Sequence, residues 1–534
     1  MPYLQFLIAA LLGLPPVIFL AHLVFYFVDP YGLRQYPGPF LARLTPAWLG
    51  WAAQQVHRAE AVHEAHKKYG PFVRISPSEV SVAVPEALPI VYGHGNGALK
   101  SSFYDSFISI GGRAIFSTLD RVQHARKRKT VAHIFSPKSV LDFEHYIRVH
   151  ITTLLGQWER MYDDALKGLS GPEGEGWTGR DGRLWFDCRP WIGYLALDTI
   201  GDLAFGAPFG MLAAGHDAAR VPATAAARKD AHFKKTETTH APAIALLNGR
   251  GEYVAALGVL PAWWRPLAAY LPWYRARAQS ASELAGMAIV AVAKRLATPS
   301  DRVDVLSKLL DGKDEHGQPL GREELTVEAH AFLIAGSDTT ATSLTAIMFH
   351  IAANPAVQER LQEELDVFLG IGDDPIAWHE QVKQLPYLDA CINEGLRVNC
   401  TNASGLPRVV PEGGLIIQGQ HFPAGAVVGV PIYTVHRDPE VWGEDADVYR
   451  PERWLDADSE KAALMQKTFT PFSSGPRACI GRNLALLEIV IIVATLFRRY
   501  NFVLAEPDKP IETREGFLRK PVHCNVGIKR RDVY

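Results

Sequence analysis

The stretch Phe472-Ser-Ser-Gly475-Pro-Arg477-Ala-Cys479-Ile-Gly481 decides how the rest of the chain is interpreted. Its cysteine stands in a setting that suits the thiolate ligand of a haem iron, and such a ligand pushes electron density to the iron and favours O–O bond cleavage. The two glycines let the backbone bend around the sulfur and bring N–H groups close to it. Arg477 offers a cation to a haem propionate, and Phe472 would shield the sulfur from water. The alternative is a buried structural cysteine in a glycine-rich turn.

Length and composition describe an ordinary globular protein. The chain has 534 residues, of which 48% are hydrophobic and 21% charged, and it contains no Ser/Gly linker or internal repeat that would divide it. A net charge of −2 does not favour nucleic-acid binding. The five cysteines are widely spaced without a CxxC pair, which favours neither a zinc site nor a disulfide framework and fits a reducing compartment.

The N-terminus differs from everything after it, because residues 1–28 contain no Asp, Glu, Lys or Arg. Roughly 25 apolar residues can span a bilayer as a helix. Arg34 and Arg43 follow, so the positive-inside rule leaves the bulk of the chain in the cytosol. A cleaved signal peptide is the alternative, but it would begin with a basic region that is absent here. The predicted organisation is a transmembrane anchor at 1–28, a proline-rich hinge at 29–45 and one large domain at 46–534.

Past the anchor, helical periodicity dominates and a few short strands interrupt it. Phe72–Ile75 and Val80–Val84 predict a hairpin, a second pair surrounds Gly419-Gln420, and a third is expected near the C-terminus. Residues 168–182 are rich in glycine and charge and are expected to form an exposed loop. The longest helical pattern runs from about Glu324 to Ala353.

The middle of that long helix breaks local rules. Ala335-Gly336-Ser337-Asp338-Thr339-Thr340 puts poor helix formers together, and local violations inside a consistent element tend to be functional. The alternative is a helix bent by glycine and back-bonding threonine for packing alone. Further along, Glu394-Gly-Leu-Arg397 places an ion pair at i, i+3 on one helix face, which by itself is a weak signal.

Taken together, the cysteine loop, the long helix and the E-x-x-R pair resemble the cytochrome P450 monooxygenases. The resemblance implies a mainly α, triangular haem-thiolate domain with small β-sheets behind the membrane anchor. It implies that Gly336 opens a groove over the iron and that Asp338 and Thr339 relay protons during oxygen activation. It also implies that Glu394, Arg397 and Arg453 form a structural network.

The same resemblance implies a haem b cofactor with Cys479 as the axial ligand. The residues expected to hold the haem are His124, Arg128, Arg408, Phe472, Gly475, Arg477 and Gly481. The basic run that contains His124 has two readings: a solvated face, or a surface at which Arg126, Lys127 and Lys129 attract an acidic electron donor. For a single-pass member in the endoplasmic reticulum membrane with a cytosolic catalytic domain, that donor would be the NADPH-cytochrome P450 reductase.

Four segments resemble a narrower group within this family, the fungal benzoate 4-monooxygenases: residues 61–70, 91–97, 388–397 and 405–411. This resemblance implies para-hydroxylation of benzoate to 4-hydroxybenzoate with O2 and electrons from NADPH. Such a site needs a mostly apolar pocket with one or two placed polar groups. The candidates for the clamp that holds the carboxylate are Lys100, Ser101, Ser102, Tyr104 and Arg113, and those for the rest of the lining are Phe332, Ala335, Thr401, Asn402 and Ser404.

Three alternative functions remain at this point. The first is a P450 that hydroxylates another small aromatic or phenolic compound. The second is a thiolate-haem isomerase or dehydratase that needs no external electrons, against which the intact Asp338-Thr339 pair argues. The third is a non-catalytic haem protein that senses ligands, which needs neither a proton relay nor a reductase.

Overall fold

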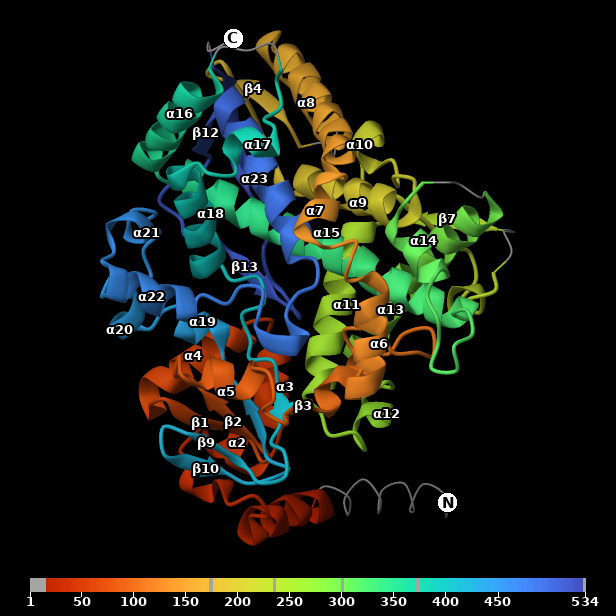
Figure 1. Ribbon diagram of the computed structural model, residues 1–534, viewed down its shortest axis with the longest axis vertical. Coiled ribbons are helices and arrows are strands. Elements are labelled where there is room, and N and C mark those ends of the chain that lie inside the picture. Colours follow the sequence, from red (N-terminus) through yellow and green to blue (C-terminus); the bar gives the residue numbers. More distant parts are fainter. Residues whose placement is uncertain (1–15, 172–175, 234–236, 299–301, 371–373, 532–534) are drawn as a thin grey trace, which may run out of the picture.

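The computed structural model describes residues 16–171, 176–233, 237–298, 302–370 and 374–531, and helices dominate it (Figure 1). The longer helices are α3 (Ala47–Gln54), α4 (Arg58–Tyr69), α6 (Arg121–Val131), α8 (Glu144–Leu166), α9 (Arg189–Phe205), α11 (Ala243–Gly258), α13 (Pro272–Ala297), α15 (Arg322–Ala352), α16 (Pro355–Leu369), α18 (Pro386–Val398), α22 (Ser459–Thr468) and α23 (Arg482–Arg499).

Short helices and 3-10 turns connect these elements. They are η1 (Leu33–Gln35), α2 (Phe40–Leu44), α5 (Ala87–Tyr92), η2 (Ser102–Phe107), α7 (Pro137–Leu141), α10 (Met211–Ala214), η3 (Ala227–Lys229), α12 (Arg265–Ala268), α14 (Val305–Leu310), α17 (His379–Val382), α19 (Ile432–Val435), α20 (Pro439–Trp442), α21 (Arg453–Asp456) and η4 (Gly475–Arg477).

The main sheet lies at the end of the molecule where the N-terminal helices gather (Figure 1). Its order is β1-β2-β11-β8-β3, formed by β1 (Phe72–Ser76), β2 (Glu79–Val82), β11 (Val427–Gly429), β8 (Arg408–Val409) and β3 (Leu99–Lys100). The β1–β2 hairpin and the pair β9 (Leu415–Ile417) and β10 (Gln420–Phe422) confirm the first two predicted hairpins. Among the strands of the described residues, β2 and β11 are the one pair that runs parallel.

A second sheet at the opposite end joins distant parts of the chain in the order β12-β15-β5-β4. It contains β12 (Tyr500–Leu504), β15 (Asn525–Arg530), β5 (Arg183–Asp187) and β4 (Thr178–Arg180). Strand β4 falls within residues 168–182, so the prediction of a loop there was wrong for its last part. The pairs β13 (Thr513–Glu515) with β14 (Arg519–Pro521) and β6 (Ala219–Pro222) with β7 (Thr238–Ala241) complete the strands of the described chain.

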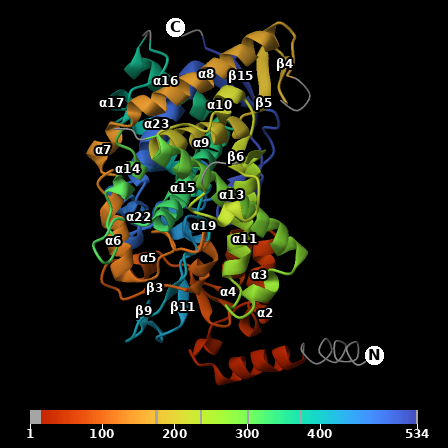
Figure 2. The same cartoon turned by 90° about the vertical axis from the view of Figure 1, so that its right-hand side faces the viewer.

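Helix α15 crosses the centre of the molecule, and α9, α13, α18 and α23 pack around it (Figures 1 and 2). Its bounds agree with the predicted helix to within two residues. The hydroxyl-bearing residues in its middle do not break it, because their side chains donate to carbonyls one turn earlier, as Ser337 Oγ does to Leu333 O at 2.7 Å and Thr342 Oγ1 to Asp338 O at 2.7 Å. The helix therefore accommodates polar side chains without losing its backbone ladder.

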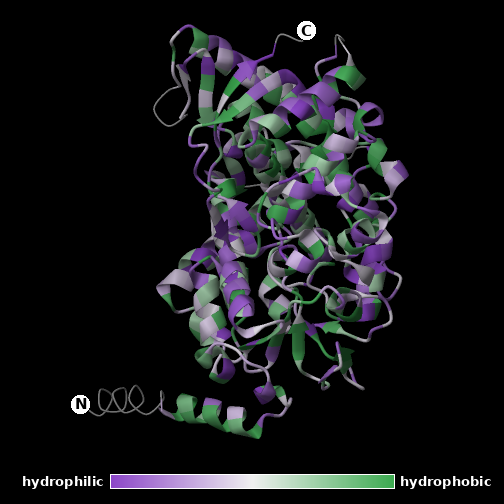
Figure 3. Cartoon of the chain, turned by 90° about the vertical axis from the view of Figure 1, so that its left-hand side faces the viewer, coloured by the Kyte–Doolittle hydropathy of each residue, from purple (hydrophilic) through white to green (hydrophobic). Residues whose placement is uncertain are grey.

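The described N-terminal residues form a helix at 16–28 that presents apolar side chains to the outside (Figure 3), including Phe19 and Phe27. Within the described ranges we find no helix whose length and hydropathy would suffice to cross a bilayer, and residues 1–15 of the predicted anchor lie outside those ranges. Residues 29–45, predicted to be a hinge, pack against the main sheet and the β9–β10 pair: Leu33 and Tyr36 are buried, and the Tyr36 ring stacks on Phe422 of β10 with centroids 5.2 Å apart.

Candidate active site

The cysteine loop is fixed by close backbone contacts. The N–H of Cys479 donates to the carbonyl of Phe472 at 2.9 Å, so the loop closes on itself. Gly475 takes a φ of +70°, and a Cβ there would overlap the carbonyl oxygen of Tyr92 at the end of α5. Only glycine satisfies both conditions, so the loop and α5 hold each other in place.

Cys479 borders an internal cavity of about 320 Å³. Helix α15 contributes Phe332, Ala335, Gly336 and Thr339 to the lining. The lining is mainly apolar, with the cysteine loop and the side of α15 among its walls. The structure therefore brings the two strongest sequence signals, which are more than a hundred residues apart in the chain, to one cavity.

The surroundings of the Cys479 thiol act on its pKa in opposite directions. Burial raises the pKa, whereas the backbone N–H of Gly481 and the guanidinium groups of Arg128 and Arg482 lower it, and burial prevails. A bound cation at the sulfur would reverse that balance, because a thiol that coordinates a metal is deprotonated. The N–H and guanidinium groups around the sulfur therefore favour the thiolate form once a metal is bound.

A cluster of cations without a carboxylate partner among the described residues lies at one side of the cavity; Lys100, Arg128 and Arg477 line the cavity, whereas Arg408, predicted to hold the haem, stands behind that lining. Arg477 donates to Thr118 O at 2.6 Å and Arg408 to the Tyr104 hydroxyl at 2.8 Å. Arg128 donates to Ala478 O at 2.9 Å, and Lys100 donates to Phe116 O. These four residues, called the cation cluster below, have neutral partners only.

Mutual repulsion is visible in the pKa values of the cation cluster. Burial, followed by Arg408, lowers the pKa of Arg477 to about 10. Burial, Arg408 and Arg477 together lower the pKa of Lys100 well below its usual value. Burial, followed by Arg477, Lys100 and Arg128, lowers the pKa of His124 to about 3, so this cavity-lining imidazole is neutral. A dianion bound beside these residues would relieve the repulsion.

These features fit a haem. Cys479 would supply a thiolate to the iron, the cation cluster would offset the charge of two propionates, and Phe472 lines the cavity beside the sulfur. Gly481 has an ordinary φ of −83°, so its backbone conformation does not require glycine. A Cβ there would meet no protein atom within 4 Å and would project into the cavity, so glycine keeps that space open. Gly336 is needed for helix packing as well, since its Cβ would lie 2.5 Å from Ile200 of α9.

Asp338 and Thr339, expected to act as a pair, point to different spaces. Thr339 lines the cavity, and its hydroxyl donates to Ala335 O at 2.5 Å. Asp338 does not line it; its Oδ2 lies 2.7 Å from Nζ of Lys520, beside a separate small cavity. Lys520 also donates to Asn248, so the carboxylate is held behind the helix face that Thr339 presents.

Glu394, Arg397 and Arg453 form a buried network. Arg397 binds Glu394 through two hydrogen bonds of 2.7 and 2.8 Å, and Arg453 Nε reaches Glu394 Oε1 at 2.8 Å. Trp454 Nε1 donates to the other oxygen at 3.0 Å. Burial alone would raise the pKa of Glu394, but the two arginines outweigh it and the pKa lies below its usual value.

The candidate substrate residues divide into two groups. Lys100, Phe332, Ala335, Thr401 and Asn402 line the cavity. The structure places the others outside that lining; they are Ser101, Ser102, Tyr104, Arg113 and Ser404.

Each misplaced candidate has a partner outside the lining, including Ser102, whose Oγ accepts from Arg265 at 3.5 Å. Arg113 is one-third exposed and binds Asp105 at 2.6 Å. Tyr104 turns inward to Arg408, and Ser404 Oγ donates to Glu515 at 2.5 Å. Ser101 caps η2 by accepting from the N–H of Phe103. The predicted clamp role of these side chains finds no support in their positions.

The basic run on α6 is largely neutralised. Arg126 binds Glu324 at 2.6 Å and Lys127 binds Glu328 at 2.8 Å, both on α15. The reading of these two residues as a free docking face was therefore wrong, because α15 supplies their counter-ions. Lys129 is exposed on the same helix.

Sequence reasoning missed Arg250 and Glu488, which both line the cavity. Burial raises the pKa of Glu488 to about 8, so this carboxyl is mainly protonated at neutral pH. Arg250 stands in Asn248-Gly-Arg-Gly251, where no motif marks it. The two flanking glycines were the available signal, since paired glycines in a helix indicate a close approach by another segment.

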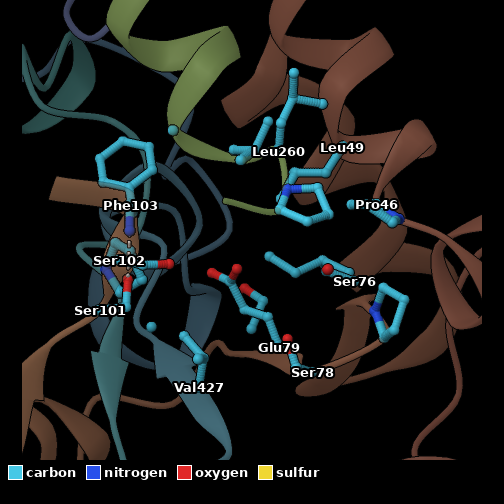
Figure 4. A pocket seen from close by; sticks show the side chains of 18 of the residues that line it. Pro46, Leu49, Ser76, Ser78, Glu79, Ser101, Ser102, Phe103, Leu260 and Val427 are labelled. Carbon is cyan, nitrogen blue, oxygen red and sulfur yellow. Dashed lines mark hydrogen bonds between the residues drawn. The ribbon is translucent and has the colours of Figure 1, made fainter. Parts of the chain in front are cut away.

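A larger cavity of about 530 Å³ lies between helix 16–28, the main sheet and the turn after α11. Figure 4 shows the Glu79 carboxylate pointing into it, between Ser102 on one side and Leu49 and Leu260 on the other. Burial raises the pKa of Glu79 to about 7. Cys479 and the α15 face are not part of this lining, so the smaller cavity is the candidate active site.

Comparisons with known proteins agree with this geometry. The family model of cytochrome P450 matches residues 42–527. Benzoate 4-monooxygenase bphA of Aspergillus niger is 45% identical over 528 residues, 96% of each chain. Cytochrome P450 monooxygenase cicH of Emericella nidulans is 30% identical over 95% of this chain and 96% of the relative, and a pisatin demethylase of Fusarium vanettenii is 29% identical over 96% and 94%. The chain therefore belongs to the cytochrome P450 family and is a P450 monooxygenase.

Proposed function

We propose that this P450 hydroxylates benzoate at C4 to give 4-hydroxybenzoate, using O2 and electrons from NADPH. The observation that carries the proposal is the 45% identity, over 96% of both chains, to a protein named for that reaction. A relative at 29% identity is named for a different reaction, the demethylation of pisatin. Identity near 30% therefore does not fix the substrate, and the assignment to benzoate depends on the relative at 45% identity. The mainly apolar lining of the cavity beside Cys479 is consistent with an aromatic substrate.

Bound haem b would activate O2 and supply the oxygen atom that enters the substrate. The chain's own part is to hold the haem through Cys479 and the cation cluster, to exclude water through Phe332 and the other apolar walls, and to deliver protons. The Thr339 hydroxyl faces the cavity and is the last donor. Asp338, on the other side of α15, would accept a proton from the Lys520 ammonium, 2.7 Å away, and pass it on toward Thr339, which leaves the Lys520 amine to be reprotonated from solvent.

The remaining partners belong to the same proposal. Electrons come from the NADPH-cytochrome P450 reductase, and exposed Lys129 is a cation at which that acidic donor can dock. Residues 1–28 anchor the chain in the endoplasmic reticulum membrane with the catalytic domain in the cytosol. Recovery of the full-length chain in carbonate-washed membranes supports this anchor; a mature N-terminus beyond residue 28 would show a cleaved signal peptide instead.

The decisive experiment is a benzoate titration of the purified holoprotein, observed at the haem Soret band. A saturable shift to the high-spin form is expected, because benzoate above the iron displaces its water. Turnover with reductase and NADPH should then give 4-hydroxybenzoate. A correctly folded thiolate haem without a shift would contradict benzoate as substrate, and turnover without NADPH would favour an isomerase or dehydratase.

A further inference from the structure

Arg250 enters the active-site cavity from α11 at a point where three backbone segments meet closely. A Cβ at Gly249 would lie 2.5 Å from Ser280 Oγ of α13, and a Cβ at Gly516 would lie 2.6 Å from the N–H of Glu252. Glycine at these positions lets α13 and the loop before β14 press against α11. That contact brings Phe517 and Arg250 into the same cavity lining.

No hydrogen bond or ion pair of the Arg250 side chain occurs among the described residues. Its guanidinium lies 5.5 Å from the centroid of the Phe107 ring. The carboxylate that acts on it is that of Asp338, but Asp338 is already bound to Lys520 at 2.7 Å. Burial lowers the pKa of Arg250 to about 10, so the residue stays charged at neutral pH.

His330 lies close enough for Arg250 to affect its pKa, but it does not neutralise the charge of Arg250. Burial and Arg250 lower the pKa of His330 to about 3, and its Nδ1 is paired with Ser109 Oγ at 2.8 Å. The surroundings of Arg250 thus contain a neutral imidazole, an aromatic ring and a carboxylate that is already paired. A half-buried guanidinium that faces the cavity in such a place is suited to bind an anion.

That anion is distinct from the haem propionates. Arg408 and Arg477 contribute to the lowered pKa of Lys100, and Arg408 to that of Arg477, whereas Asp338 is the charged group that acts on the pKa of Arg250. The cavity therefore has two positive regions, and the cation cluster accounts for only one of them. The charge of Arg250 remains available to a ligand that enters the cavity.

We propose that Arg250 binds the carboxylate of the substrate and thereby directs the opposite end of an aryl acid toward the haem; this rests on the proposed function. A planar guanidinium binds a carboxylate through two parallel hydrogen bonds, which fixes the ring axis as well as its position. Phe107 and Phe517 flank the anchor and hold the ring. The specificity that follows is for aromatic acids over neutral analogues and for the para position.

The test uses Soret titrations of the holoprotein with benzoate and with methyl benzoate. For Arg250→Gln, the dissociation constant of benzoate should rise by about 100-fold or more, while that of methyl benzoate should change by less than about threefold. Arg250→Lys keeps the charge but loses the planar guanidinium, so its dissociation constant for benzoate should lie between those of the wild type and Arg250→Gln. Arg113→Gln, which removes a cation outside the cavity, is the matched control and should stay within about twofold.

Failure of the anchor and failure of the proposed function give different results. If the wild type binds benzoate and Arg250→Gln binds it equally well, or loses both ligands equally, Arg250 is not the anchor and the function stands. If the wild type ignores benzoate but binds another aryl acid, such as phenylacetate, that Arg250→Gln loses selectively, the anchor stands and benzoate is wrong. A wild type that binds no aryl carboxylate overturns the anchor. Should Arg250→Gln yield no holoprotein, Arg250→Lys decides, with about tenfold weaker benzoate binding expected.

Discussion

Two regions of this protein bury arginines in opposite ways. In the network below the cavity, Arg397 and Arg453 share the carboxylate of Glu394, and their remaining donors reach backbone carbonyls. In the cation cluster, Arg408 and Arg477 bind only neutral oxygen atoms. A buried arginine with a carboxylate partner stabilises the fold. A buried cation without one is costly unless an anion binds it, so it indicates a ligand site.

The largest effect is expected where the matched network is broken. Arg397→Ala leaves Glu394 buried with one cation fewer, and losing one partner of a buried pair costs about 3–5 kcal/mol. We expect little haem-containing protein, measured as the yield of the reduced CO-bound spectrum. Glu394 and Arg397 are both fully buried, so water cannot replace the missing guanidinium. A normal yield of stable holoprotein would contradict the network's structural role.

Removing an unmatched cation should affect the ligand rather than the fold. Arg477→Gln deletes a charge whose protein partners are backbone carbonyls. Charge-assisted hydrogen bonds contribute about 1.5–3 kcal/mol each, so haem transfer to a scavenging protein should be about 10- to 100-fold faster. Unchanged haem retention would remove Arg477 from the propionate site.

A pH experiment tests the matched network in a second way, because this network contains a buried neutral histidine. Burial, followed by Arg397, lowers the pKa of His436 from 6.5 to about 3. Below pH 6.5 the unfolded chain takes up this proton and the folded chain does not, so stability is complete above that pH and falls as the pH decreases. Between about pH 6.5 and about pH 5 the loss is about 2 kcal/mol per such histidine.

Urea unfolding of the holoprotein at several pH values measures this slope. His436→Gln keeps a polar group at the site, where the imidazole Nε2 accepts from the N–H of Thr470 at 3.2 Å, and should flatten the slope. The carboxylate of Glu394 contributes at lower pH, because its pKa lies below the usual 4.5. An unchanged slope in His436→Gln would mean that other groups govern acid unfolding.

The sequence predicted residues that lie in local patterns, in the cavity as well as in the network, better than residues that only the fold brings together. Cys479, the E-x-x-R pair and the polar centre of α15 are local patterns, and each lies in the expected kind of element. Arg250 carries no local pattern, since its role depends on the approach of Phe517, which is more than 260 residues away in the chain. Tertiary contacts of this kind are invisible to periodicity and spacing.

The same reason explains the misplaced candidates. Arg113 lies in the expected stretch of chain, but Asp105, eight residues earlier, binds it at the rim. Arg126 and Lys127 read as a basic face until α15 brings Glu324 and Glu328 against them. In each case the residue type and its place in the chain were known, and the identity of the partner decided its function.

The smallest effect is expected at an exposed cation, which needs no partner because water solvates it. Lys129 and Lys127 lie on the same helix, but Lys127 is buried between Glu324 and Glu328. Lys129→Gln should change the free energy of unfolding by less than about 0.5 kcal/mol. If Lys129 faces the reductase, reduction of the haem should slow by about twofold at low salt and recover at high salt. Stopped-flow reduction measures both conditions, and Lys127→Gln provides the contrast, since it leaves Glu328 buried without its cation and should lower stability instead.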